Sequence, residues 1–167
     1  MILVTYATTH GSTEEVADAV AKELRSQNLE VELANCKNVR SVDPYEAVLL
    51  GVPLYMFRLH GHARRFLARQ EDSLKNMPVA LFVLGPFHDD EKEWNDARSQ
   101  LDKELGKYPW LKPVSQKLFG GKFDPDNMRM PYKMLPALKK LGEGDIRDWD
   151  AIREWANTLP TVLKTGS

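Results

Sequence analysis

Short apolar runs alternate along the chain with longer segments in which apolar residues recur every three or four positions. Each short run predicts a β-strand, at residues 2–6, 29–35, 47–52, 79–84 and 115–123. The longer segments predict amphipathic helices, a first one from Ser12 onward and others at 62–74, 91–105 and 149–163. The run at 47–52 is apolar throughout, which is typical of a strand covered on both faces of a sheet, and we expect it to stop at Pro53.

Strands that alternate with helices in this way predict an α/β fold, because parallel strands need crossover connections that cover both faces of the sheet. We expect one domain over residues 1–167, a three-layer α/β/α sandwich whose five-stranded parallel sheet has the order 2-1-3-4-5. In this topology ligands bind beyond the carboxyl ends of strands one and three, where the loops at 8–13 and 53–60 converge. Residues 124–144, interrupted by three prolines, are expected to form an irregular excursion before the last helix.

The loop Thr8–Thr13 joins the first strand to a helix and combines hydroxyl side chains, one glycine and free backbone amides. Such a loop binds a phosphate through neutral donors, and the helix dipole adds to the attraction. Ser12 and Glu15 have the S-x-x-E spacing of a capping box, which places the helix start right after the loop. The chain lacks the lysine of an ATP-binding P-loop and the glycine spacing of a dinucleotide fingerprint, which favours a phosphate monoester. The alternative is a capped helix after a polar turn, without any ligand.

Two segments resemble a known family. The order strand, (S/T)-x-x-G-x-T, helix at Thr8–Thr13 resembles the phosphate loop of the FMN-binding flavodoxins, with His10 where threonine or serine is more usual. The sequence Phe119–Asp124, followed by Gly144–Ala156, is similar to the carboxyl half of the flavodoxin-domain branch that contains the menaquinone-dependent protoporphyrinogen dehydrogenases. The resemblance covers essentially the whole chain and implies a flavodoxin-like fold with FMN at the ends of the first, third and fourth strands.

The resemblance also implies which residues hold the cofactor. Those around the phosphate are Thr8, Thr9, His10, Gly11, Ser12 and Thr13. One edge of the isoalloxazine ring is lined by Pro53, Leu54, Tyr55, Met56 and Phe57, and the other by Gly85, Pro86, Phe87 and His88. Tyr55 and Phe57 are the best candidates to stack on the flavin, because a flat ring needs aromatic or apolar faces. For both side chains the alternative is packing beneath the loop.

Cationic side chains follow the second of these loops. Residues 57–69 include four arginines and two histidines but no acid. We expect Arg58, His60 and Arg64 to bind the carboxylates of a substrate, such as the propionates of a porphyrinogen, since arginine pairs with carboxylates through two hydrogen bonds. The alternative is that these charges simply solvate one helix face, and the acids at 89–96, which are available to pair with the arginines, strengthen it.

Charge and cysteine content narrow the function classes. The chain has 23 basic and 24 acidic side chains for a net charge of −1, which argues against general nucleic-acid binding and against a strongly acidic electron carrier. The single cysteine, Cys36, forms no internal disulfide or thiolate metal site, and the histidines match no metal pattern, so we expect a cytoplasmic protein without a metal. No signal peptide or membrane-spanning stretch is recognised. The methionines, leucines and cations of 128–141 leave open a peripheral contact with a membrane or a protein partner, a lid over the flavin, or packing onto the last helix.

The sequence therefore favours an FMN-dependent redox protein that carries out electron transfer or oxidoreduction. A redox partner protein, a quinone and a tetrapyrrole-like substrate are the partners that the resemblance implies. No single catalytic residue is identified. The alternative is a non-enzymatic binding or regulatory module that has the fold without the flavin, which the unusual His10 allows and the retained Gly11, Ser12 and Thr13 argue against.

Overall fold

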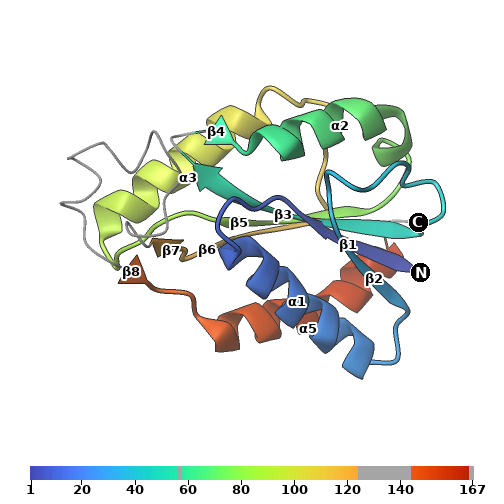
Figure 1. Ribbon diagram of the computed structural model, residues 1–167, viewed down its shortest axis with the longest axis horizontal. Helices are drawn as coiled ribbons and strands as arrows, with labels where there is room; N and C mark the ends of the chain where they lie inside the picture. The colour runs from blue at the N-terminus through green and yellow to red at the C-terminus, as the bar shows by residue number, and fades with distance from the viewer. Residues whose placement is uncertain (56–57, 124–143, 166–167) are drawn as a thin grey trace.

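The computed structural model describes residues 1–55, 58–123 and 144–165. Its central sheet confirms the predicted topology, because the five parallel strands lie in the order β2-β1-β3-β5-β6 (Figure 1). These strands are β1 (Ile2–Tyr6), β2 (Val31–Asn35), β3 (Ala47–Tyr55), β5 (Val79–Leu84) and β6 (Ser115–Phe119). A short strand, β4 (Arg58–Leu59), pairs antiparallel with the end of β3, and β7 (Lys122–Phe123) pairs antiparallel with β8 (Gly144–Asp145).

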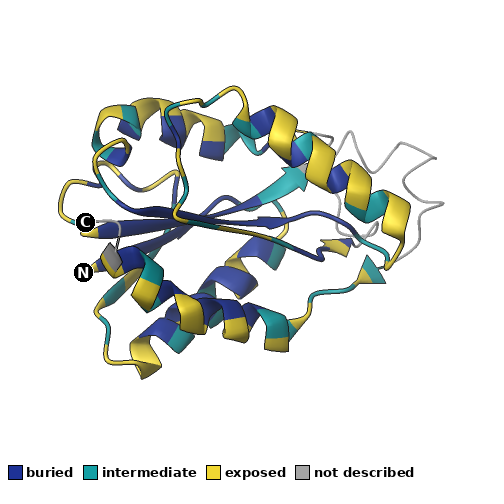
Figure 2. Ribbon diagram, turned by 180° about the vertical axis from the view of Figure 1, so that it is seen from behind, coloured by how far each residue is buried: buried dark blue, intermediate teal, exposed yellow. Residues whose placement is uncertain are grey.

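Four helices among the described residues cover the two faces of this sheet and make the three-layer sandwich (Figure 1). On one face lie α1 (Ser12–Ser26) and α5 (Trp149–Thr165), and on the other lie α2 (Gly61–Leu74) and α3 (Glu91–Leu105). Two hydrophobic clusters fill the spaces between these layers, the first with α1 and α5 and the second with α2 and α3. Buried residues dominate the middle of the sheet, as the apolar runs predict (Figure 2).

A close contact at the centre of the sheet explains one glycine of β3. A Cβ atom at Gly51 would lie 2.1 Å from Cζ of Phe82 on the neighbouring β5, so the ring occupies the space that a side chain would need. Phe82 is fully buried and makes an edge contact with Trp155 of α5, with ring centroids 6.0 Å apart. The glycine therefore lets an aromatic side chain pack between the sheet and α5.

The third strand was predicted to stop at Pro53, and this prediction is wrong. β3 continues to Tyr55 and turns back into β4. The pairing of β3 with β1 ends at Gly51, so beyond this residue β1 no longer pairs with that edge of β3. A proline, which has no N–H group to donate, is therefore tolerated there.

The fifth strand, predicted at 115–123, is also interrupted. β6 ends at Phe119, and the chain turns at Gly120 and Gly121 before β7. The backbone N–H of Gly121 donates to Pro86 O over 2.7 Å, which directs β7 across the end of β5. The break places β7 beside the loop that follows β1, where the candidate site is found.

Candidate functional site

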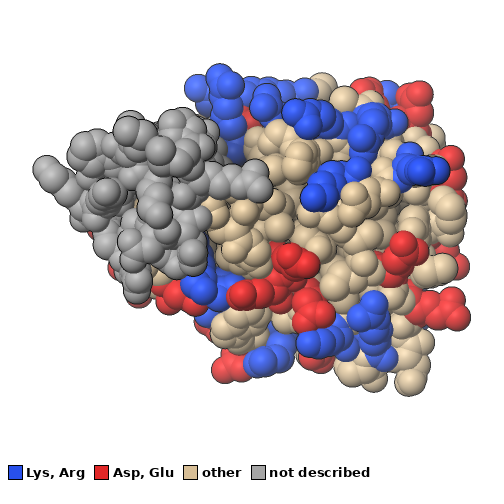
Figure 3. All heavy atoms as spheres, in the orientation of Figure 1, with Lys and Arg blue, Asp and Glu red and all other residues tan. Residues whose placement is uncertain are grey.

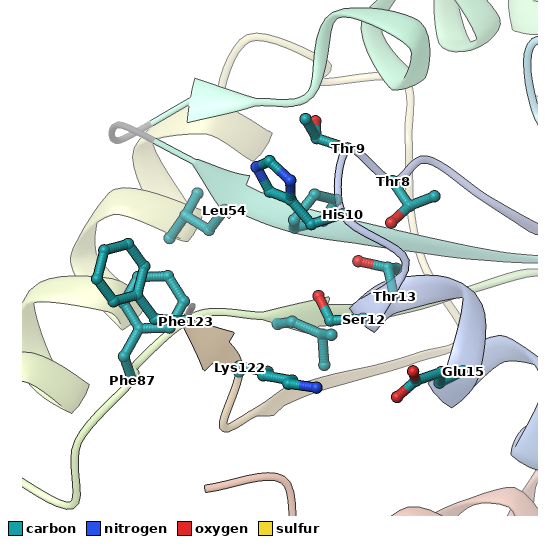
Figure 4. Close-up of a pocket in the computed structure, with 13 residues that line it drawn as sticks. Thr8, Thr9, His10, Ser12, Thr13, Glu15, Leu54, Phe87, Lys122 and Phe123 are labelled. Carbon is teal, nitrogen blue, oxygen red and sulfur yellow. The ribbon is translucent and has the colours of Figure 1, made fainter. Parts of the chain in front are cut away.

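The principal pocket among the described residues opens at the carboxyl ends of β1, β3 and β5, where the fold predicts a ligand (Figure 4). It contains about 760 Å³ of space, part of which is open to solvent. One end is polar and is lined by Thr8, Thr9, His10, Ser12, Thr13, Glu15 and Lys122. Leu54, Phe87 and Phe123 lie at the other end (Figure 4), and Pro53, Leu84 and Gly121 complete the lining. An elongated ligand with a polar group at one end and a flat apolar ring at the other matches this division.

The polar end is built on residues 8–13, which we call the phosphate loop after the ligand group that the sequence predicts there. Gly11 has a φ of 88°, a left-handed conformation in which other residues are strained, so the glycine is required for the turn. Its N–H donates to Oγ1 of Thr8 over 2.8 Å, and its carbonyl accepts the first hydrogen bond of α1, from Glu15 N. These contacts set the shape of the loop before any ligand arrives.

The predicted capping box is absent, because Gly11 takes the N-cap position and Ser12 is already the first helical residue. No side chain of the described residues forms a capping hydrogen bond at the start of α1. The first N–H groups of a helix have no carbonyl acceptor within the helix, so they remain donors toward the pocket. Glu15, the other half of the predicted box, turns instead to Arg147.

Thr13 is the most informative residue of the loop. It is completely buried, and its hydroxyl oxygen has no hydrogen-bond partner among the described residues. A buried hydroxyl without a partner is unfavourable by roughly 1–3 kcal/mol, so such groups usually serve a ligand or an ordered water. Thr13 lines the pocket beside Ser12, and Figure 4 shows both hydroxyl groups at the phosphate loop.

A hydrogen bond joins the phosphate loop to the start of α2. Oγ1 of Thr9 lies 2.8 Å from Nε2 of His60, while Nδ1 of His60 accepts from His62 N over 3.1 Å and caps the helix. An Nδ1 that accepts must be unprotonated, so in neutral His60 the proton is on Nε2 and is donated to Thr9. Burial, followed by the nearby cations, lowers the pKa of His60 and favours this neutral form. The Thr9 hydroxyl then keeps its own proton to donate toward the pocket.

The apolar end contains two phenylalanines from different loops. The rings of Phe87 and Phe123 lie 5.1 Å apart between centroids at an angle of 37° (Figure 4). Glu93 of α3 holds the first of these loops, since it accepts from Phe87 N over 2.6 Å and contacts Nδ1 of His88 over 3.2 Å. Leu54 of β3 lies at the same end (Figure 4), and Pro53 also lines the pocket. The apolar end is therefore bounded by carbon-rich groups on β3 and on the loops after β5 and β6.

Several predicted ring contacts lie elsewhere or beyond the described part. Gly85 and Pro86 are buried and serve the backbone, because Gly85 N donates to Phe119 O and Pro86 O accepts from Gly121 N. They are not among the pocket-lining residues, and neither is His88. The side chains of Tyr55, Met56 and Phe57, and the segment 128–141, are outside the described residues.

The cationic side chains that were predicted to bind a substrate follow the end of β3 that borders the pocket. We call Arg58 of β4 and Arg64 and Arg65 of α2 the cationic rim, and all three residues are exposed. Figure 3 shows basic side chains gathered over the part of the surface where Figure 1 has β4 and α2. Within the described ranges, the ion pairs include none between this rim and the acids at 89–96, so the exposed arginines are open to a ligand or to solvent, and the solvated helix face stays the alternative.

β4 is held in place by a buried carboxylate. Glu104 of α3 is 3% exposed and accepts from the backbone N–H of Leu59 over 3.3 Å. It also forms an ion pair with Lys107. Burial by itself would raise the pKa of Glu104, but the hydrogen bonds from Lys107 and Leu59 bring it below the ordinary value, so the group is ionised at neutral pH. The C-terminal end of α3 thereby holds β4 in position, and β4 carries Arg58 opposite Tyr55, the residue after the lining residue Leu54.

The sequence analysis missed five lining residues. They are Glu15, Leu84, Gly121, Lys122 and Phe123. The signal that was available is the Gly-Gly pair at 120 and 121, which marks the turn that carries Lys122 and Phe123 back over the loop.

A sequence profile described as "Flavodoxin domain" matches residues 3–145. The chain belongs to the flavodoxin domain family. A protoporphyrinogen IX dehydrogenase [quinone] from Escherichia coli K12 is 22% identical over an alignment of 168 positions, which covers 94% of this chain and 93% of that protein. This similarity supports the branch that the sequence resembles.

Solved structures show the same fold. Oxidised Flavodoxin 1 from Bacillus cereus superposes with a TM-score of 0.61 at 14% identity, over 96% of this chain and 97% of that chain. Rubredoxin oxygen:oxidoreductase from Desulfovibrio gigas gives a TM-score of 0.58 at 16% identity, over 99% of this chain and 36% of that larger chain. None of the helices formed by the described residues has the length and apolar character that a membrane span requires.

Proposed function

We propose that this flavodoxin domain binds FMN in the pocket and acts as an FMN-dependent oxidoreductase. The observation that carries the proposal is the buried, unpartnered hydroxyl of Thr13 at the start of α1, at the polar end of a pocket whose other end is apolar. A phosphate monoester supplies acceptors for the Thr13 and Ser12 hydroxyls and for the free amides of the first helical turn. A flavin ring fits the apolar end between β3 and the two phenylalanines.

In this proposal the protein binds and orients the cofactor. The phosphate loop holds the phosphate through neutral donors, and His60 orients the Thr9 hydroxyl as one of them. Pro53, Leu54 and Phe123 exclude water from one end of the pocket. Bound FMN supplies the electron transfer itself, as a cofactor does in flavoproteins generally.

The substrate that we propose carries carboxylates. Arg58 and Arg64 are exposed near the pocket, and arginines bind carboxylates through paired hydrogen bonds. His60 contributes by its contact with the phosphate loop more than by facing the rim, since both of its ring nitrogens are already hydrogen-bonded. The name of the E. coli relative pairs a tetrapyrrole with a quinone, and we propose the same classes of electron donor and acceptor here.

Titration with FMN tests the cofactor. We expect the wild-type chain to bind FMN with a shifted visible spectrum, and Thr13→Val to weaken binding by roughly 10- to 100-fold, the worth of a hydrogen bond to a charged group. Thr5→Val is the matched control, because Thr5 is also fully buried but its hydroxyl already donates to Ala34 O over 2.8 Å. The control is expected to lose some stability and to keep its FMN affinity. A wild-type chain that binds no FMN would leave the fold as a binding or regulatory module.

Turnover tests the enzyme. The FMN-loaded chain is mixed with a reduced carboxylate-bearing tetrapyrrole under anaerobic conditions, and oxidation is followed with and without a quinone. Oxidation that depends on both FMN and quinone supports the oxidoreductase. FMN binding without turnover, combined with reduction by a partner protein, would identify an electron carrier instead.

A further inference from the structure

The first turn of α1 is a poor place for a phosphate by charge alone, because it carries two acids, Glu14 and Glu15. Glu14 is engaged by Tyr6, whose hydroxyl donates to it over 2.8 Å. Burial and this hydrogen bond raise the pKa of Tyr6 to about 12, so the phenol remains a donor. Glu15 lines the pocket itself, and its unbalanced charge would repel a phosphate dianion.

A distant arginine meets Glu15. Arg147 lies between β8 and α5, and its Nη1 is 2.5 Å from Oε2 of Glu15, across 132 residues of sequence. The same nitrogen lies 3.4 Å from the carbonyl oxygen of Ser12, a residue of the phosphate loop. The arginine therefore reaches both the backbone of the loop and the acid next to it.

The position of Arg147 is fixed from the other side as well. Its Nε and Nη2 both donate to the Asp145 carboxylate over 3.0 Å, and its guanidinium lies over the ring of Trp149 at 4.8 Å. The Arg147 side chain is 5% exposed, although Glu15 is 55% exposed. Such a two-pronged, stacked arginine is held rigidly, unlike a solvated surface pair.

We propose that Arg147 is the positioning residue of the phosphate site: it neutralises Glu15 and fixes the first turn of α1, so that a dianionic phosphate is accepted by a loop that has no lysine or arginine of its own. This inference rests on the proposed binding of FMN. Arg147 acts through Glu15 and Ser12 and need not touch the phosphate.

The charged side chains around the first turn of α1 show why the positive charge of Arg147 matters for an anionic ligand. Glu15 and Asp145 are the acids that pair with Arg147. Lys122 lines the pocket, and Figure 4 shows its side chain extending toward Glu15. Removal of Arg147 deletes one positive charge next to Glu15 and therefore increases the net negative charge beside the phosphate. Neighbouring charges interact appreciably in a partly buried site, so the loss of the positive charge of Arg147 should weaken the binding of an anionic ligand.

Comparing FMN with riboflavin isolates the effect, because riboflavin has the same ring and no phosphate. Affinities for both ligands are measured by fluorescence titration for the wild-type chain and for Arg147→Met, Arg147→Lys, Glu15→Gln and the double variant Arg147→Met/Glu15→Gln. Asp18→Asn is the matched control, since Asp18 is an acid of the same helix that pairs with Lys22 outside the pocket.

The expected results differ in sign. Arg147→Met lowers the FMN affinity about tenfold and leaves the riboflavin affinity within about twofold. Glu15→Gln raises the FMN affinity about twofold to threefold, and the double variant returns close to wild type. Arg147→Lys keeps most of the affinity because it keeps the charge, and Asp18→Asn changes neither ligand.

Three outcomes would overturn the inference. If Arg147→Met weakens FMN and riboflavin by the same factor, the arginine only supports the fold. If Glu15→Gln does not strengthen FMN binding, Glu15 does not repel the phosphate, and this variant decides the question even if Arg147→Met fails to fold. If the wild-type chain binds neither flavin, the proposed function and this inference both fall, whereas flavin binding with an unchanged FMN-to-riboflavin ratio removes only the role of Arg147.

Discussion

The phosphate loop and the cationic rim lie on either side of the Thr9–His60 hydrogen bond, yet they are built in opposite ways. The loop has no cation, and its shape is fixed by short-range contacts, by the left-handed Gly11 and by the buried Thr13. The rim consists of exposed arginines on β4 and α2. Rigid neutral donors give affinity and selectivity for one ligand, whereas long exposed cations give a weaker, salt-dependent attraction for many anions. We therefore expect the loop to select the cofactor and the rim to recruit the substrate.

The largest effect is expected at Gly11, on which the shape of the loop depends. Gly11→Ala forces a side chain into a φ of 88°, which destabilises the fold by about 1–2 kcal/mol. The space around the new Cβ atom is open, so the penalty comes from the backbone and not from a clash. A loop that relaxes to an ordinary φ no longer aims its donors, and FMN affinity should fall at least tenfold. Urea unfolding and FMN titration measure the two quantities.

Gly106→Ala is the control for this substitution. Gly106 ends α3 with a φ of −59°, which alanine adopts without strain. Its new Cβ atom would lie 3.4 Å from the nearest carbonyl oxygen, an ordinary contact. This variant should bind FMN as the wild type does. Equal losses in both variants would mean that the phosphate loop is no more rigid than the rest of the surface.

The features that could be predicted from the sequence depend on contacts between residues close together in the chain, and those that were missed depend on contacts between distant segments. A polar loop between β1 and α1 was predictable because its hydrogen bonds join neighbours, such as Gly11 with Thr8, whereas its binding of a phosphate stays a prediction. The sheet order was predictable because apolar runs and crossovers leave few topologies. Even so, the start of α1 was assigned to a capping box, since S-x-x-E spacing cannot reveal that a left-handed glycine takes the N-cap position.

The rest of the site depends on pairs that are far apart in sequence. Thr9 meets His60 across 51 residues, and Glu15 meets Arg147 across 132. Neither pair is marked in the sequence by a motif or a regular spacing, because the two segments of each pair come together only when the sheet folds. The continuation of β3 past Pro53 was missed for a similar reason, since a proline is tolerated only where a neighbouring strand has ended.

The next largest effect concerns His60, which connects the two regions. His60→Ala removes the cap of α2 and should lower the free energy of unfolding by about 1 kcal/mol. It also frees the Thr9 hydroxyl, so FMN affinity should fall about threefold. His60→Asn separates the two roles, because asparagine is a good N-cap but is too short to reach Thr9. Full stability with reduced FMN affinity in His60→Asn would support the link, and unchanged affinity in both variants would break it.

A smaller effect is expected from pH. Burial, with help from His62, Arg64 and Arg65, lowers the pKa of His60 below its ordinary 6.5, so the unfolded chain takes up a proton before the folded protein does. The stability from neutral His60 is therefore complete above about pH 6.5 and is lost as the pH falls from there through the folded-state pKa. Urea unfolding at pH 7.5 and pH 5.5 should show a larger decrease for the wild type than for His60→Asn. The same decrease in both proteins would assign the pH dependence to other groups.

The smallest effect on the cofactor, and the sharpest separation of the two regions, is expected at the rim. Arg58→Gln and Arg64→Gln should leave FMN affinity within twofold, because both side chains are exposed and are not among the lining residues of the pocket. The KM for a carboxylate-bearing substrate should rise about threefold for each, with the difference shrinking as salt is added, since exposed pairs are worth up to about 1 kcal/mol and are screened. Arg153→Gln is the control. Arg153 is an exposed arginine that pairs with Asp150 of the same helix, α5, and this helix covers the face of the sheet opposite to α2. A rise in KM that Arg153→Gln shares would reflect overall charge, and a loss of FMN affinity in the rim variants would mean that the rim and the phosphate loop form one site.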